Sequence, residues 1–178
     1  AKNELFDELV DENGRDIDAR WREGRRDRLI ETFRAARPDV LMTETFPFGR
    51  RLLEFELMAL LEEAKRAPHR PKNVSSVRDV LQRPRKDARA AAIVERARAF
   101  YDAVIVHGDP NVLRLEQSFA ETAAIASRCI YTGYICADIP KRMGSGREIL
   151  VSAGGGAAGG GLIATALEAR KRTRVADS

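Results

Sequence analysis

The sequence predicts an α/β protein with a Rossmann-like parallel sheet and helices on both faces. Short apolar segments alternate with helical segments along the chain, which is the pattern of parallel strands joined by crossover helices. The segment "AVIVHG" at 103–108 is almost wholly apolar, as expected of a strand with both faces covered. A chain of 178 residues is long enough for at least one full core.

The first predicted unit is a helix, a strand and a second helix. The first helix covers 19–37, where apolar residues recur at helical spacing, and it stops at Pro38. The strand is "DVLMTE", 39–44. After the turn "TFPFG", an amphipathic helix covers about 50–66.

The middle of the chain repeats this alternation. "NVSSV" at 73–77 is the second strand, a helix covers about 85–101, and 103–108 is the third strand. The following "DPNVLRLEQSF" begins with an aspartate suited to a helix cap and a proline suited to the first helical position, so another helix is expected. "CIYTGYI" at 129–135 is the fourth strand.

A change in composition predicts a domain boundary. The segment 138–147 is typical of a linker, and 149–152 reads as a strand followed by a glycine-rich loop and a helix. We therefore expect a partial N-terminal domain at 1–137 and the start of a C-terminal domain at 148–178. Alternatively, the last strand joins the same sheet.

Composition excludes several classes of protein. The 31 basic residues are interleaved with 27 acidic ones, which does not favour nucleic-acid binding. Two cysteines are too few for a disulfide framework and lack zinc-site spacing, so no metal is expected. No apolar run approaches the roughly 20 residues of a membrane span, which predicts a cytoplasmic protein. Any membrane contact would be peripheral, on the inner face; the helix 50–66 could make it, although core packing is favoured.

The glycine-rich loop is a candidate phosphate site. Gly154, Gly156 and Gly159 fit the spacing G-x-G-x-x-G between a predicted strand and helix, where backbone N–H groups can approach a phosphate. Such a glycine-rich run meets many spacings by chance. A flexible connector and close strand–helix packing remain open as alternatives.

Polar residues at the ends of the predicted strands form a second candidate site, because ligands of open α/β sheets bind at the carboxyl ends of the strands. Glu44 could act as a base. His107 could be a base or a hydrogen-bonded structural residue. Arg78 could neutralise a phosphate or pair with Asp79. Ser76 lies in the same region.

The order of the motifs carries a resemblance. "RPDVLMTETFPFGRRLLEFEL", "VSSVRDVL", "FYDAVIVHGDP", "IYTGYI" and "ILVSAGGGA" follow one another. In this order they resemble predicted glycosyltransferases related to the MurG-type N-acetylglucosaminyltransferases, over almost the whole chain.

This resemblance implies a GT-B architecture, in which two Rossmann-like domains face each other across a cleft. It implies transfer of a sugar from a nucleotide-sugar donor, UDP-linked, to an unidentified acceptor. The nucleotide-sugar is then a substrate, and no cofactor is expected. On this reading Ser152, Gly154, Gly155 and Gly156 face the donor or acceptor, Ser76, Arg78 and Asp79 border the cleft, and the base candidates are Glu44, Asp79 and His107.

Three alternatives stay open from the sequence. A nucleotide-sugar hydrolase or epimerase could use the same fold. A dinucleotide-dependent oxidoreductase is favoured only by the glycine spacing. A non-catalytic binding domain is the third alternative, and it would gain support if the strand-end polar residues were paired with one another.

Overall fold

The computed structural model describes residues 8–82, 87–137, 149–153 and 159–172. The chain divides into two compact units, Ala1–Ile135 and Cys136–Ser178. Each unit is described by itself.

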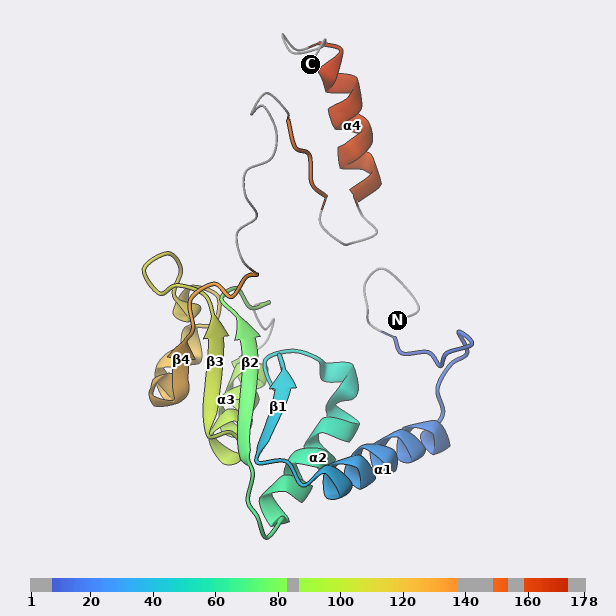
Figure 1. Cartoon of the computed structure of the whole chain (residues 1–178), viewed down its shortest axis with the longest axis vertical. Helices are drawn as coiled ribbons and strands as arrows, with labels where there is room; N and C mark the ends of the chain where they lie inside the picture. The colour runs from blue at the N-terminus through green and yellow to red at the C-terminus, as the bar shows by residue number, and fades with distance from the viewer. Residues whose placement is uncertain (1–7, 83–86, 138–148, 154–158, 173–178) are drawn as a thin grey trace. The chain divides into compact units, whose positions relative to one another are not determined.

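The first unit is built on a parallel sheet. Among the described residues it has 4 strands in the order β1-β2-β3-β4, namely β1 (Val40–Glu44), β2 (Lys72–Arg78), β3 (Ala103–His107) and β4 (Cys129–Tyr131). Each neighbouring pair is parallel (Figure 1). The predicted α/β fold class, a parallel sheet flanked by helices, is confirmed.

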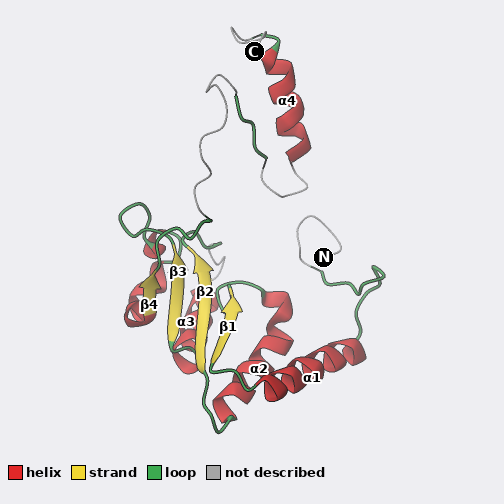
Figure 2. Ribbon diagram, in the orientation of Figure 1, coloured by secondary structure: helices red, strands yellow, loops and turns green. Residues whose placement is uncertain are grey.

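The helices of this unit begin and end close to the predicted positions. Helix α1 is Ala19–Ala36, α2 is Glu54–Arg66 after the short 3-10 turn η1 (Arg51–Leu53), and α3 is Asp87–Phe100 (Figure 2). Asp18 caps α1 by accepting a hydrogen bond from the Trp21 amide at 2.7 Å. Helix α1 packs on α2 through Phe33, Leu60 and Ala64.

The helices cover one face of the sheet. Val77, Val104 and Val106 share that face, because Val77 is aligned with Val106 and side chains alternate along each strand. They are buried against α3 and the segment 115–128 in the main core cluster. Near β1, Phe46, Leu61 and Tyr101 form a second cluster on the same side.

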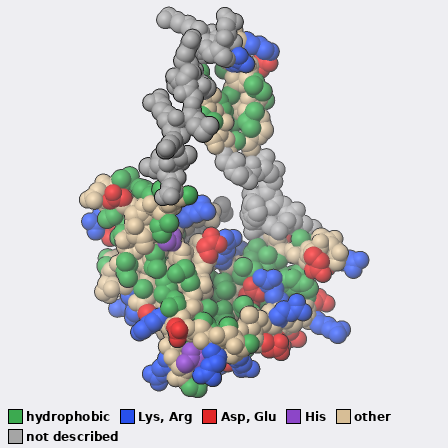
Figure 3. Space-filling view, viewed as in Figure 1, with side chains coloured by type: hydrophobic (Ala, Val, Ile, Leu, Met, Phe, Trp, Pro, Cys, Tyr) green, Lys and Arg blue, Asp and Glu red, His purple; other side chains and the backbone are tan. Residues whose placement is uncertain are grey.

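The opposite face carries exposed apolar side chains in the part of the chain that the structure describes. Val40, Met42 and Ile130 are 52%, 55% and 55% exposed, and hydrophobic side chains gather over the strands in Figure 3. The sequence prediction placed helices on both faces. Right-handed crossovers that run in one direction through the order β1-β2-β3-β4 all fall on one side, which explains why these helices share a face.

One predicted helix is wrong. After Asp109 the chain makes a single turn, in which the amides of Val112 and Leu113 donate to the Asp109 carbonyl. Two 3-10 segments follow, η2 (Leu115–Gln117) and η3 (Ala120–Arg128). Arg114 is extended, with φ −92° and ψ 144°, and Leu115 is fully buried, so core packing overrides the local helix signal.

In the second unit, helix α4 (Gly160–Arg170) follows the glycine-rich loop as expected. The predicted strand at 149–152 does not form: residues 149–153 have no strand assignment, since a strand needs a hydrogen-bonded neighbour. No residue of α4 is buried by the described part of the chain.

Candidate functional site

The sheet register brings the strand-end candidates together. Glu44 is aligned with Ser76, and Arg78 is aligned with His107. Because side chains alternate along a strand, all four lie on the exposed face of the sheet, at its C-terminal end. We call this end, with Thr132 just after β4, the carboxyl edge.

A chain of hydrogen bonds crosses the carboxyl edge from β2 to the end of β4. Ser76 Oγ lies 2.8 Å from His107 Nε2, and His107 Nδ1 lies 3.0 Å from Thr132 Oγ1. Ser76 and His107 are both partly buried. An imidazole held at both nitrogens next to a hydroxyl can exchange protons in a defined direction, which is the arrangement general base catalysis needs.

Glu44 is held by a residue of the following turn. Arg50 Nη2 lies 2.7 Å from Glu44 Oε2, and both side chains are at least half exposed. Two buried hydrogen bonds hold the turn between Glu44 and Arg50. The Phe46 carbonyl accepts them from the Thr43 hydroxyl at 3.1 Å and the Ser75 hydroxyl at 2.8 Å. The position of the Glu44–Arg50 pair is therefore set by buried contacts of β1 and β2.

Asp79 does not pair with Arg78. Its Oδ2 accepts a hydrogen bond from the Tyr134 hydroxyl at 3.2 Å, and its Oδ1 accepts one from the Val80 amide. Partial desolvation and the bond to Asp79 raise the pKa of Tyr134. The backbone of Gly108 lies close to Asp79: a Cβ added to Gly108 would lie 2.5 Å from Asp79 Cβ.

The side chain of Arg78 is exposed and makes no hydrogen bond or ion pair with any residue that the structure describes. Its aligned position beside His107 therefore places an available cation at the carboxyl edge. A guanidinium group in this state can bind a phosphate or carboxylate through two N–H donors.

Sequence reasoning missed three residues of the carboxyl edge. Arg50, Thr132 and Tyr134 contact the predicted candidates Glu44, His107 and Asp79 respectively. Thr132 and Tyr134 were hidden because the fourth strand was predicted to run to 135, whereas β4 ends at Tyr131. The strand-end rule applied at the observed boundary selects Thr132.

The glycine candidates belong to the second unit of the chain. Gly154, Gly155 and Gly156 lie outside the described residues. Ser152 is described in the second unit, where it is exposed. Gly159, at the cap of α4, lies so close to Ala153 that a Cβ would sit 2.3 Å from the alanine Cβ, so close packing there requires glycine.

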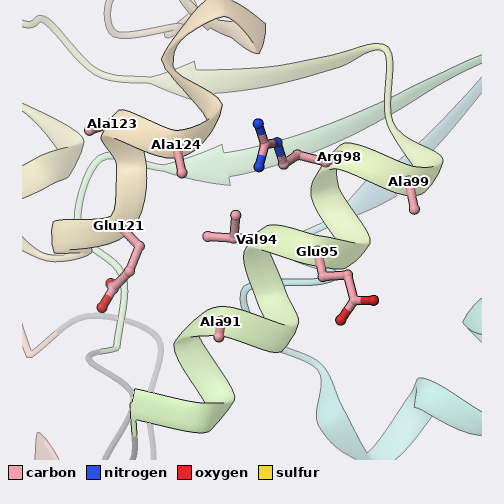
Figure 4. A pocket seen from close by; sticks show the side chains of 8 residues that line it. All are labelled: Ala91, Val94, Glu95, Arg98, Ala99, Glu121, Ala123 and Ala124. Carbon is pink, nitrogen blue, oxygen red and sulfur yellow. The ribbon is translucent and has the colours of Figure 1, made fainter.

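The surface hollow in Figure 4 is a separate feature, with a volume of about 750 Å³. It lies between α3 and η3, and half of its lining residues are alanines; the others are Val94, Glu95, Arg98 and Glu121. None of the strand-end residues lines it. Its shallow alanine surface supplies few groups that could direct chemistry.

The remaining titratable candidates are structural. His69 is partly buried and stacks on Phe33 with ring centroids 6.0 Å apart. Burial, with a smaller effect of Glu116, raises the pKa of Cys129, so its thiol is a poor nucleophile at neutral pH.

The described residues lack two further features. They contain no group of three or more histidine, cysteine, aspartate or glutamate side chains arranged to hold a metal ion. None of their helices is both long and apolar enough to cross a bilayer. Compared with known proteins, the chain matches no family model, no curated protein and no solved structure.

Proposed function

We propose that this chain is part of a nucleotide-sugar glycosyltransferase, which transfers a sugar from a UDP-linked donor to an acceptor hydroxyl. The observation that supports it is the hydrogen bond between Ser76 Oγ and His107 Nε2, 2.8 Å long, at the carboxyl edge. Ligands of open parallel sheets bind at this edge. The order of the motifs in the sequence supports the choice of sugar transfer.

The proposed reaction is a displacement at the anomeric carbon of the donor. A base removes the proton of the acceptor hydroxyl, the acceptor oxygen forms a bond to the anomeric carbon, and the bond from that carbon to the diphosphate breaks. Negative charge then grows on the leaving diphosphate. A nearby guanidinium group stabilises that charge, and Arg78 has no competing partner among the described residues.

The contacts favour His107 as the base over the two carboxylates. Glu44 Oε2 already contacts Arg50 Nη2 at 2.7 Å, so this carboxylate is engaged by a cation. Asp79 accepts hydrogen bonds from Tyr134 and the Val80 amide. Histidine, by contrast, exchanges protons near neutral pH.

Calorimetric titration of the full chain with UDP and UDP-sugars tests the proposal. Arg78→Ala should weaken UDP binding by about 10- to 100-fold, because a charge-assisted hydrogen bond contributes about 1.5–3 kcal/mol. Arg89→Ala is the matched control, since Arg89 is exposed on α3, and it should leave binding unchanged.

The outcomes separate the proposal from its alternatives. Absence of binding at millimolar UDP and UDP-sugar would exclude the donor assignment. Release of free sugar from a UDP-sugar without any acceptor would indicate hydrolysis in place of transfer. Retention on an immobilised dinucleotide in place of UDP would favour an oxidoreductase.

A further inference from the structure

The hydroxyl of Thr132 makes three polar contacts with only one hydrogen to donate. Thr132 Oγ1 lies 3.0 Å from the Gly133 carbonyl, 3.4 Å from the Val106 carbonyl and 3.0 Å from His107 Nδ1. A carbonyl oxygen can only accept a hydrogen bond. The contacts with the carbonyls are therefore favourable only when the Thr132 hydrogen points toward them.

This hydrogen count favours one tautomer of His107. With the Thr132 hydrogen directed at a carbonyl, Thr132 Oγ1 can only accept from the ring, so Nδ1 must carry a hydrogen. In neutral histidine the other nitrogen is then unprotonated. Nε2 is left as the acceptor, and the Ser76 hydroxyl donates to it over 2.8 Å.

The opposite tautomer would leave the network with repulsive contacts. If Thr132 donated to Nδ1, its oxygen would face two carbonyl oxygens with no hydrogen between them. The orientation that leaves the fewest contacts without a hydrogen runs from Ser76 through His107 and Thr132 to a backbone carbonyl.

The backbone holds Thr132 in place. Its amide donates to the Val106 carbonyl at 3.1 Å, which continues the pairing of β3 and β4 past Tyr131. Gly133 follows with φ +71°, a conformation that other residues rarely adopt, and its carbonyl contacts the Thr132 hydroxyl. These backbone contacts after β4 place the Thr132 hydroxyl next to the His107 ring.

We propose that Thr132 is a positioning residue that holds His107 with its hydrogen on Nδ1, leaving Nε2 as the basic nitrogen at the carboxyl edge. The role of that nitrogen as a base rests on the proposed function. The tautomer itself does not.

The proton path follows from this arrangement. The acceptor hydroxyl gives its proton to Ser76 Oγ as Ser76 passes its own proton to Nε2, or it replaces Ser76 and gives the proton to Nε2 directly. In both cases the acceptor O–H bond breaks and an Nε2–H bond forms. The resulting imidazolium keeps its Nδ1–H bond to the lone pair of Thr132, which stabilises the positive charge.

Nuclear magnetic resonance of the imidazole nitrogens tests the assignment directly. The chain has 2 histidines, so His107 is identified by comparison with a His69→Gln variant. Long-range proton–nitrogen spectra distinguish a protonated ring nitrogen from an unprotonated one. At a pH above the range in which histidines titrate, we expect His107 to show a protonated Nδ1 and an unprotonated Nε2.

Substitution at Thr132 then tests its role. Thr132→Val keeps the shape and removes the hydroxyl, so the hydrogen should move to Nε2, which then donates to Ser76. Thr132→Ser should restore the original tautomer. Thr32→Val is the matched control, because Thr32 bonds only within α1, to the Arg28 carbonyl at 2.8 Å, and it should leave the His107 signals unchanged.

Each outcome of these experiments supports or overturns the positioning role of Thr132. A protonated Nε2 in the unaltered chain, or an unchanged tautomer in Thr132→Val, would overturn the proposal. Should Thr132→Val fail to fold, the tautomers of the unaltered chain and of Thr132→Ser still decide it. UDP titration reports on the proposed function separately: a chain that shows the expected tautomer and binds no UDP would retain the positioning role and lose the glycosyltransferase assignment.

Discussion

Ser76 Oγ and His107 Nε2 lie 2.8 Å apart, which joins the ends of β2 and β3 through their side chains. The neighbouring Ser75 points the other way, is fully buried and donates to the Phe46 carbonyl at 2.8 Å. These adjacent serines therefore have different roles, one at the carboxyl edge and one in the core.

We expect alanine substitution to separate the two roles. Ser76→Ala should lower the free energy of unfolding by less than about 1 kcal/mol, because water can replace the serine at the partly exposed ring. Ser75→Ala should cost about 1–3 kcal/mol, because it removes a buried hydrogen bond. Urea denaturation measures both values, and a larger loss for Ser76→Ala would contradict the burial of these side chains.

Gly108→Ala should distort the carboxyl edge. The added Cβ would lie 2.5 Å from Asp79 Cβ, so the chain must shift, at a cost of about 1–3 kcal/mol in the free energy of unfolding. The shift should also break the bond between Asp79 and Tyr134, which proton spectra of Tyr134 would reveal.

Gly24→Ala is the matched control for this change. Gly24 lies inside α1, and outside the backbone of that helix a Cβ on it would meet nothing within 4 Å. The same substitution should therefore stabilise the protein here, by about 0.5–1 kcal/mol. Equal effects of both substitutions on thermal unfolding would show that the contact with Asp79 is unimportant.

The pair of Arg25 and Glu56 should stabilise the packing of α1 on α2. Glu56 is 3% exposed, and two nitrogens of Arg25 contact its carboxylate at 2.5 and 3.1 Å. Arg25→Ala leaves a buried carboxylate without its cation, so we expect a loss of about 2–4 kcal/mol.

Arg34→Ala provides the comparison on the same helix. Arg34 pairs with Glu63 at 2.6 Å, but the arginine side chain is 64% exposed, so its removal should change the free energy of unfolding little. Urea denaturation of both variants at the same salt concentration makes the comparison. Similar losses in the free energy of unfolding for the two variants would mean that the burial of Glu56 does not increase the contribution of its pair with Arg25.

Tyr101 should make the protein sensitive to alkali. Burial, opposed in part by the bond to Thr43, raises the pKa of Tyr101 above the value of about 10 expected in the unfolded chain. The folded protein thus keeps a proton that the unfolded chain loses. This contribution to stability is complete below about pH 10 and declines as the pH rises further, by up to about 1.4 kcal/mol per pH unit.

Tyr101→Phe isolates the effect. The variant should lose some stability at neutral pH, since the bond to Thr43 is removed, but its stability should fall less steeply above about pH 10. Denaturant unfolding at several pH values gives the two slopes. Identical slopes would place the alkaline sensitivity elsewhere in the chain.

The sequence was sufficient to predict the four strands of the sheet and most of the carboxyl edge, for a definite physical reason. Strands of a parallel sheet end at one side, so Glu44, Ser76, Arg78 and His107 are brought together whatever the details of packing. Knowing only that each follows or closes an apolar segment is enough to group them.

Features that depend on tertiary contacts were not predictable. The helix expected after Asp109 is absent because Leu115 enters the core, and its amide donates to the Tyr131 hydroxyl at 2.8 Å, a contact between segments separated in sequence. Thr132 was not recognised as a strand-end residue because β4 ends at Tyr131, earlier than the apolar pattern suggests, and Gly133 with φ +71° follows Thr132. Neither the burial of Leu115 nor the early end of β4 produces a periodic pattern in the sequence.

The Phe46 carbonyl, which accepts bonds from Thr43 on β1 and Ser75 on β2, has both of its lone pairs occupied. The turn that presents Glu44 and Arg50 is thus preorganised before any ligand arrives. A ligand binding there would lose little affinity to ordering of this turn. Differences in affinity among ligands would then reflect the shape and charge of each ligand, because the turn keeps the same conformation for all of them.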